Sequence, residues 1–182
     1  MKKVYLFLAY GYEEVETITI VDLLRRARIE AVTVSITENN IVTGAHLIPI
    51  ITDIKLDENR FRRAEAIILP GGQPGVDNVY ACEKVLNLIR EKYNDGKIIG
   101  AICAAPIILG RMGLLEGKKA TCYPGCEDEL KGAIISDEKV CVDGNIVTSR
   151  GVGTAIDFAL ELIRLLEGEE KAAEVKASIL FD

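Results

Sequence analysis

One cysteine of this chain occupies a position that favours nucleophilic chemistry. Cys103 follows an apolar run of strand length, residues 97–102, and precedes a segment of helical character that contains Pro106. Small residues lie two positions before and two positions after it, at Ala101 and Ala105. This spacing is typical of the nucleophile elbow, a sharp strand-to-helix turn that leaves no room for larger side chains. The sequence therefore predicts a nucleophilic thiol at this junction.

Cys103 is also expected at the start of a helix, and this position predicts a lowered pKa for its thiol. Unpaired backbone N–H groups and the helix dipole favour an anion there, and the thiolate is the reactive form of cysteine. Pro106 fits the first helical turn, where its missing N–H costs nothing. The alternative is a packed and inert core thiol, because free cysteines are among the most buried residues.

Two glycines could supply an anion pocket beside this thiol. Gly71 and Gly72 follow Pro70 at the end of a second apolar run, and their backbone N–H groups are unhindered. The elbow geometry makes the N–H of Ala104 a further candidate donor. A turn without a ligand is the alternative for the glycine pair.

Three glutamates lie in or near the first turn of the first predicted helix, where a carboxylate could hydrogen-bond the cysteine: Glu13, Glu14 and Glu16. A solvated helix terminus is the alternative for each, since acidic side chains there offset the dipole. His46 is the only histidine, and we expect it in an exposed loop. The sequence therefore disfavours a cysteine protease, which pairs its thiol with an imidazole.

Length and composition favour one soluble domain over residues 1–182. Hydrophobic residues make up 49% of the chain, and the net charge of −6 argues against a nucleic-acid surface, which needs clustered Lys and Arg. No signal peptide or membrane-spanning run is indicated, so we expect no membrane partner and a cytoplasmic location. Five cysteines without a C-x-x-C pair, and a single histidine, predict neither a disulfide framework nor a metal site.

Apolar runs of strand length alternate with helical spacing along most of the chain. We expect strands at residues 4–9, 31–36, 65–69, 97–102 and 119–123, hairpins within 41–51 and 140–148, and helices that end near residues 26, 93, 113, 166 and 177. Thr154 could cap the last long helix. This alternation predicts an α/β fold with a mostly parallel sheet and helices on both faces. Sites of such folds lie beyond the carboxyl ends of the strands, where residues 10–13, 70–72 and Cys103 all fall.

Four motifs in the same order resemble the ThiJ/PfpI superfamily: GYEEVET at 11–17, LPGG at 69–72, AICAAP at 101–106 and TSRGVGTAIDFAL at 148–160. The resemblance runs from residue 4 to about residue 177. It is strongest to the branch that contains the Parkinson's disease protein deglycase and its bacterial relatives. It implies a flavodoxin-like three-layer sandwich and a homodimer. Related proteases carry Cys-His at the elbow, whereas Ala104 follows Cys103 here, which favours the deglycase branch.

The resemblance implies roles for four residues at the centre of the site. Cys103 would be the reactive cysteine, and Glu16 would be the carboxyl group that contacts it. Gly72 and Ala104 would match the backbone donors of the anion pocket.

The resemblance also points to residues farther out. Arg26 would match the family's arginine at the end of the first helix. Ser149 and Arg150 fall in residues 148–151, which would match a stretch beside the site. Tyr123 stands where several members carry a histidine, so a mechanism that needs an imidazole at that position is not expected here.

The implied function is a cysteine-dependent enzyme of the glyoxalase or protein deglycase type. It would convert an α-oxoaldehyde such as methylglyoxal, or its early adducts on proteins, to lactate without a metal or organic cofactor. A redox-responsive stress protein or chaperone is the alternative from another class, because an accessible thiolate is also what peroxide oxidises. An intracellular cysteine protease is the third and least favoured reading.

Overall fold

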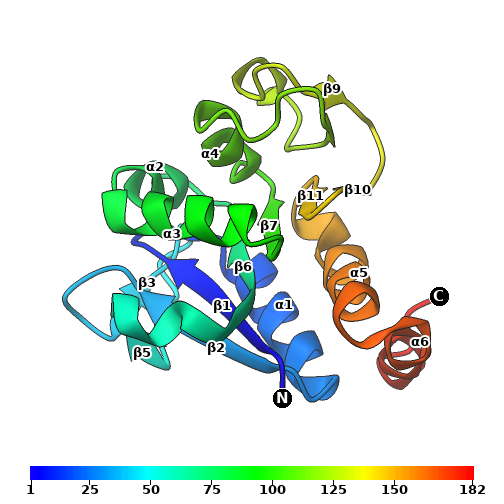
Figure 1. Ribbon diagram of the computed structural model, residues 1–182. Coiled ribbons are helices and arrows are strands. Elements are labelled where there is room, and N and C mark those ends of the chain that lie inside the picture. The colour runs from blue at the N-terminus through cyan, green and yellow to red at the C-terminus, as the bar shows by residue number, and fades with distance from the viewer.

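A seven-stranded sheet forms the centre of the molecule, with the strand order β10-β11-β7-β6-β1-β2-β5. The structure is a computed structural model of the chain; it describes the backbone throughout and the side chains of residues 1–57 and 60–182. All neighbouring strands of this sheet are parallel except β10 and β11, which pair as an antiparallel hairpin. The mostly parallel sheet expected from the sequence is therefore confirmed (Figure 1).

The strands of the large sheet are β1 (Lys3–Leu8), β2 (Glu30–Ser35), β5 (Ile54–Lys55), β6 (Ala64–Leu69), β7 (Ile98–Ile102), β10 (Val140–Asp143) and β11 (Ile146–Ser149). Two small sheets pair β3 (Ile41–Thr43) with β4 (Pro49–Ile51), and β8 (Lys119–Ala120) with β9 (Ile134–Ile135). The α-helices are α1 (Glu14–Arg26), α2 (Gly75–Tyr80), α3 (Glu83–Asn94), α4 (Pro106–Arg111), α5 (Ala155–Glu167) and α6 (Glu169–Ser178). Short 3-10 turns are Glu58–Arg63, Glu127–Glu129 and Val152–Thr154.

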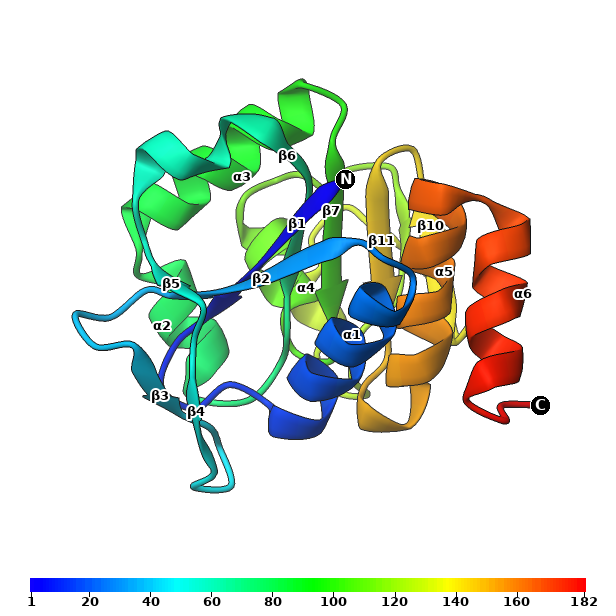
Figure 2. The same cartoon turned by 90° about the horizontal axis from the view of Figure 1, so that it is seen from below.

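Helices cover both faces of the sheet, as Figure 2 shows from below. Alternate residues of β1 pack into different cores: Val4 and Leu6 lie with α1 and α5, whereas Tyr5 and Phe7 lie with α2 and α3 on the other face. A strand buried on both faces is apolar throughout, which is why β1 reads as a continuous hydrophobic run. The flavodoxin-like three-layer sandwich is confirmed.

The order of the central strands brings three loops to one edge of the sheet. Strands β1, β6 and β7 are neighbours and parallel, so their carboxyl ends lie side by side. The segments that follow them are residues 9–13, residues 70–72 and Cys103. The predicted convergence of these segments at the sheet edge is therefore confirmed (Figure 1).

Three local predictions differ from the structure. The strand expected at 119–123 is reduced to Lys119–Ala120, because these residues pair with β9 in a separate small sheet. The helix expected to end near residue 113 ends at Arg111. Thr154 precedes α5, but its hydroxyl bonds Gly151 and Ser149 instead of capping that helix.

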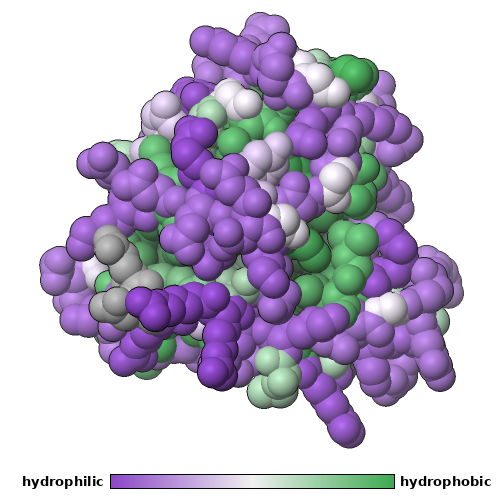
Figure 3. Space-filling model, in the orientation of Figure 1, coloured by the Kyte–Doolittle hydropathy of each residue, from purple (hydrophilic) through white to green (hydrophobic). Residues whose placement is uncertain are grey.

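Hydrophilic residues cover most of the molecular face shown in Figure 3, with smaller hydrophobic areas between them. Across residues 1–57 and 60–182, none of the helices combines the length and apolar character needed to cross a membrane.

Candidate active site

Cys103 lies in a strained turn between β7 and α4. Its φ angle is +65°, in the left-handed region that residues with a Cβ atom rarely adopt. Two backbone hydrogen bonds hold it there: its N–H donates to the carbonyl of Ser149 at 3.0 Å, and its carbonyl accepts the N–H of Tyr123 at 2.8 Å. The Cys103 side chain at this elbow is partly exposed.

Two backbone donors point at the thiol sulfur. The N–H groups of Gly72 and Ala104 hydrogen-bond Cys103 and act to lower its pKa. Gly72 has a φ angle of +91°, and a Cβ atom there would lie 2.5 Å from the backbone N of Glu13 and from the carbonyl O of Gly11. Glycine is therefore required for this close approach of the backbone to the first helix.

Glu16 is fully buried in the first turn of α1 and faces Cys103. Its Oε2 accepts the N–H of Gly71 at 2.8 Å, while Oε1 has no hydrogen-bond partner by geometry among the described residues. Burial raises the pKa of this carboxyl to about 7; the Gly71 N–H and the Cys103 thiol act in the opposite direction. Near neutral pH the group can therefore both accept and donate a proton.

The lowered thiol pKa expected from the helix terminus is a prediction that the structure corrects. Burial raises the pKa of Cys103, and the adjacent Glu16 carboxylate raises it further, which outweighs the Gly72 and Ala104 N–H groups. α4 is also only six residues long. At neutral pH the resting thiol of Cys103 therefore keeps its proton, and a thiolate forms when that proton passes to the Glu16 carboxylate.

Gly71 has a different role from the one predicted. Its N–H is engaged by Glu16, so it is no donor to an anion at the thiol. Its missing side chain matters instead, because a Cβ atom would lie 2.5 Å from Cys103 Cβ and 3.0 Å from both Cys103 Sγ and Glu16 Oε2. Gly71 therefore allows the carboxyl group and the thiol to lie together.

Glu13 contributes to the site in a way that the sequence analysis missed. Its Oε2 accepts the backbone N–H of Glu16 at 2.7 Å and caps α1, and its own N–H donates to the Gly71 carbonyl at 2.8 Å. The spacing of three residues between Glu13 and Glu16 is the signal that could have indicated this cap. The solvated terminus considered for the three glutamates is wrong, since all of them are buried.

Tyr123 and Gly151 form the rim around the sulfur. A Cβ atom at Gly151 would lie 3.4 Å from Cδ2 of the Tyr123 ring and 3.8 Å from Cys103 Sγ. The Tyr123 ring is half exposed, with a relative accessibility of 53%. The aromatic ring and the thiol sulfur thus both lie close to Gly151.

Three residues that the resemblance matched to family positions bond residues outside the Cys103 site through their side chains. The Ser149 hydroxyl bonds the Lys139 carbonyl and the Thr154 hydroxyl, although the Ser149 backbone does hold Cys103. Arg150 bonds Asp137. Arg26 pairs with Asp22 at the far end of α1, about 15 Å along the helix from Glu16.

A family model described as the DJ-1/PfpI family matches residues 2–165. The chain belongs to the DJ-1/PfpI family. The resemblance predicted from the four motifs is thereby confirmed. The chain is 35% identical to protein dj-1beta of Drosophila melanogaster, over 98% of this chain and 97% of that protein. It is 39% identical to protein DJ-1 homolog B of Arabidopsis thaliana over 98% of this chain, but it spans only 41% of that relative's length.

Solved structures of DJ-1 proteins have the same fold over the whole chain. A cysteine-to-alanine mutant of a DJ-1 superfamily protein from Salmonella typhimurium matches with a TM-score of 0.95 and 34% identity, and both chains are covered completely. An oxidized DJ-1 from Toxoplasma gondii matches with a TM-score of 0.94 and 34% identity, over 100% of this chain and 99% of that one.

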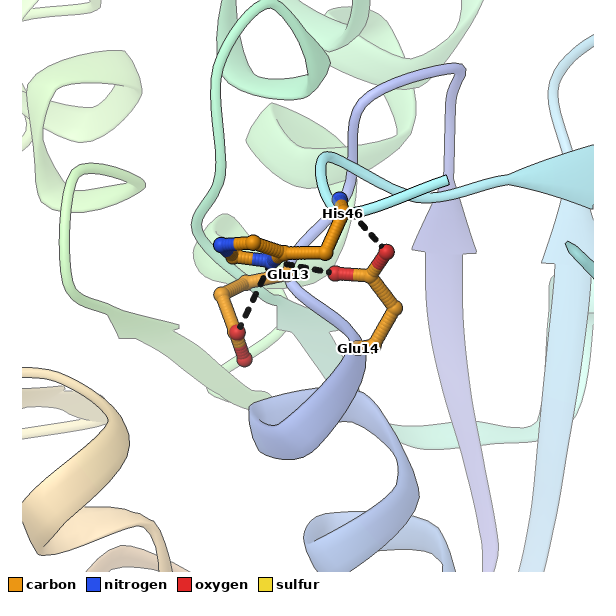
Figure 4. A group of neighbouring side chains, drawn as sticks. All are labelled: Glu13, Glu14 and His46. Carbon is orange, nitrogen blue, oxygen red and sulfur yellow. Dashed lines mark hydrogen bonds and ion pairs between the residues drawn. The ribbon is translucent and has the colours of Figure 1, made fainter. Parts of the chain in front are cut away.

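His46 belongs to a second cluster, which this DJ-1/PfpI chain builds at the N-terminus of α1 (Figure 4). Its side chain is exposed, as expected, but its Nδ1 lies 3.0 Å from Glu14 Oε2 and 3.8 Å from Glu13 Oε1. The imidazole thus faces two carboxylates of α1 instead of the thiol. No sequence pattern indicated this cluster, because His46 lies 32 residues from Glu14 along the chain.

Proposed function

We propose that this chain is a cysteine-dependent enzyme that converts α-oxoaldehydes, free or as early adducts on proteins, to 2-hydroxy acids. The observation that carries the proposal is the pairing of the Cys103 thiol with the buried Glu16 carboxyl, whose Oε1 has no hydrogen-bond partner among the described residues. A nucleophile and a group that exchanges protons near pH 7 thus face the same small space.

The first step is addition of the thiolate to the aldehyde carbon of methylglyoxal. The sulfur–carbon bond forms, the carbonyl electron pair moves to oxygen, and that oxygen takes a proton to give a hemithioacetal. The N–H groups of Gly72 and Ala104, which already point at the sulfur, lie where they can stabilise the negative charge that develops. Glu16 supplies the proton that this oxygen takes, because the Glu16 carboxyl group is protonated while Cys103 is a thiolate.

The second step moves a proton between the two adjacent carbons. Glu16 Oε1 removes the proton from the carbon bonded to sulfur and returns it to the neighbouring carbon, while the hydroxyl proton passes from the oxygen of the first carbon to the oxygen of the second. The first carbon is thereby oxidised and the second is reduced. The product is a lactoyl thioester of Cys103, and water then breaks the sulfur–carbon bond to release lactate and the thiol. The sum is methylglyoxal plus water giving lactate, so the reaction needs no external oxidant, reductant or organic cofactor.

The proposal extends to location and assembly. We place the enzyme in the cytoplasm and expect it to form a homodimer. The support for a dimer is an apolar stripe on α1, where Val15 and Ile18 remain about half exposed. Neither nucleic acid nor a membrane is proposed as a partner.

Replacement of Glu16 by glutamine tests the proposed role of the carboxyl group. Glu16→Gln keeps the shape and the hydrogen bond from Gly71 but cannot shuttle a proton. We expect lactate formation from methylglyoxal to fall by roughly 100-fold or more. The matched control is Glu174→Gln on the surface of α6, which should retain wild-type turnover. Retained turnover in a folded Glu16→Gln protein would remove Glu16 from the mechanism.

A redox-sensing role is the second candidate, and the surroundings of the Cys103 sulfur favour it. Cys122 and Cys141 are buried, whereas Cys82, Cys103 and Cys126 are partly exposed, and Cys103 has two backbone N–H donors at its sulfur. The thiolate sulfur attacks hydrogen peroxide in the first step and the sulfenate sulfur does so in the second; each time an S–O bond forms, the O–O bond breaks, and the hydroxide that leaves takes a proton to become water. Protonated Glu16 could hydrogen-bond the resulting sulfinate and stop oxidation there. The oxidized DJ-1 from Toxoplasma gondii is consistent with this candidate.

Mild peroxide treatment separates this candidate from general thiol oxidation. We expect intact mass to increase by two oxygen atoms, and peptide mapping to place both at Cys103. Cys103→Ser should show no such increase under the same conditions. Oxidation spread evenly over the five cysteines would reject the sensor role.

A further inference from the structure

The cluster of Glu13, Glu14 and His46 lies beside the proposed reaction centre but is not used by it. We propose that these three residues bind a divalent transition-metal ion of the first row, with Zn²⁺ as the ion of choice. One carboxylate oxygen from each glutamate and Nδ1 of the imidazole would be the protein ligands. No metal site was predicted from the sequence, because the spacing of its cysteines and single histidine matches no metal-ligand pattern.

The three ligand atoms already converge. Nδ1 of His46 lies 3.0 Å from Glu14 Oε2 and 3.8 Å from Glu13 Oε1, and a ligand atom from each of the three residues lies within 4.8 Å of the others. Metal–ligand bonds of about 2.0–2.2 Å to N and O require ligand atoms 3–4 Å apart. Small movements would therefore suffice to enclose an ion, as Figure 4 shows by the direction of the three side chains.

The oxygen atoms that face away from this centre are held by backbone groups. Glu14 Oε1 accepts the N–H of His46 at 2.7 Å and that of Ile48 at 3.4 Å, and Glu13 Oε2 accepts the N–H of Glu16 at 2.7 Å. Such outer hydrogen bonds orient the ligands of metal sites. Each carboxylate is therefore fixed by one oxygen and presents the other to His46.

Burial and charge give an independent reason to expect a cation. The side chains of Glu13 and Glu14 are only 9% and 6% exposed, and two buried carboxylates that share one imidazole are not neutralised by it. The described residues give Glu13 Oε1 no hydrogen bond, only the 3.8 Å ion pair with His46. A divalent ion would give this oxygen a bonding partner and balance the two negative charges.

The ligand chemistry selects the class of ion. Imidazole suits zinc and its first-row neighbours, whereas magnesium and calcium prefer oxygen ligands throughout. The His46 side chain is 71% exposed, so the ion has direct access from solvent, and water would complete the coordination. The site is separate from the Cys103 reaction, although Glu13 also caps the turn that carries Glu16.

Because His46 is the only histidine, its imidazole nitrogens give an unambiguous signal in ¹⁵N NMR. We expect Zn²⁺ to shift the Nδ1 resonance with saturation at one ion per chain, and to fix the proton on Nε2. Glu14→Gln should weaken this titration at least tenfold, since even changes to outer partners of metal ligands cost that much. The surface control Glu174→Gln should titrate like the wild type.

Mn²⁺ provides a second measurement that avoids the thiols, because this ion prefers oxygen and nitrogen ligands. Loss of the free Mn²⁺ EPR signal should report one site in the wild type and none of comparable affinity in His46→Gln, a substitution at an exposed side chain that should preserve the fold. Zn²⁺ bound without any change in the His46 nitrogens would overturn the proposal. Equal affinity in wild type and Glu14→Gln, or equal Mn²⁺ binding in wild type and His46→Gln, would do the same.

Discussion

At the scale of single residues, the proposed chemistry depends on one buried carboxyl group. Glu16 lies against the thiol, and a single backbone N–H donates to its Oε2. Burial is therefore the largest influence on its pKa and raises it to about 7. An ordinary surface glutamate would be ionised near pH 7 and could not hold the proton for Cys103. The same burial that makes Glu16 useful also costs stability.

This cost predicts a pH dependence of unfolding. The pKa of Glu16 is raised from 4.5 in the unfolded chain to about 7 in the folded protein. Folded protein retains the proton between these values and unfolded protein loses it, so this group makes stability fall as pH rises from 4.5 to about 7. Relative to Glu16→Gln, the wild type should lose roughly 3 kcal/mol of unfolding free energy over that window.

Urea unfolding of both proteins at pH 4 and pH 8, with EDTA present to remove metal ions, measures this difference. Because Glu16→Gln lacks only the titrating group, the comparison cancels the other carboxylates. A stability difference between the two proteins that stays constant from pH 4 to pH 8 would show that the Glu16 pKa is not raised.

The residues of the site were predictable to different degrees. Cys103 and Glu16 could be named from the elbow pattern and the family motifs, and the structure brings them together. The raised pKa of the Cys103 thiol could not be predicted, because burial and the charge of Glu16 arise only from the fold. The assignment of the Gly71 N–H failed for the same reason, since the sequence does not show that a carboxylate reaches it.

At the scale of elements, the site depends on the close packing of the loop after β6 against the elbow. A Cβ atom added at Gly71 would lie 2.5 Å from Cys103 Cβ, which is shorter than real contacts between such atoms. Gly71→Ala must therefore push the loop and the elbow apart and separate Glu16 from the thiol. We expect a folded protein with at least tenfold lower turnover, since small misplacements of catalytic groups cost rate.

Gly153→Ala is the matched control for this substitution. Nothing lies within 4 Å of a Cβ atom at Gly153, so alanine fits without movement. Turnover and the circular dichroism spectrum should both equal those of the wild type. If Gly71→Ala were as active as Gly153→Ala, close packing of this loop would not be a requirement of the site.

Long elements were predictable because their patterns reflect burial. The apolar run of β1 and the helical spacing of α3 and α5 reflect contacts on both faces of the sheet and on one helix face. Short elements carry no such pattern. The two-residue strand β8 depends on pairing with β9, fifteen residues farther along the chain, and residues 121–123 leave the strand.

At the scale of the whole molecule, the exposed apolar residues of α1 bear on assembly. Val15 and Ile18 are 52% and 50% exposed and lie three residues apart on one side of the helix. A charge placed there would be buried in the proposed dimer but solvated in a monomer. Ile18→Lys should therefore convert a homodimer to a monomer with little change in the fold.

Sedimentation velocity of the wild type and Ile18→Lys tests this prediction, with Lys176→Ala on α6 as a surface control. We expect dimers for the wild type and the control and a monomer for Ile18→Lys. An unchanged dimer in Ile18→Lys would place the interface elsewhere, and a monomeric wild type would reject the homodimer.

The overall architecture was the most predictable feature of this protein. Alternating strands and helices indicated a parallel sheet, and the order of β1, β6 and β7 then dictates that their loops share one edge. The cluster at His46 could not be predicted, because a hairpin with no chemical motif carries the imidazole to α1.

The most direct test of the proposed function is lactate formation from methylglyoxal by wild type and Cys103→Ser in a buffer without amines. Lactate is the informative product, because methylglyoxal adds reversibly to any nucleophile and its disappearance alone shows little. The proposed reaction predicts steady lactate production by the wild type and none above background by Cys103→Ser. Equal lactate from both proteins, or none from the wild type, would contradict the assignment of Cys103 as the nucleophile of this reaction.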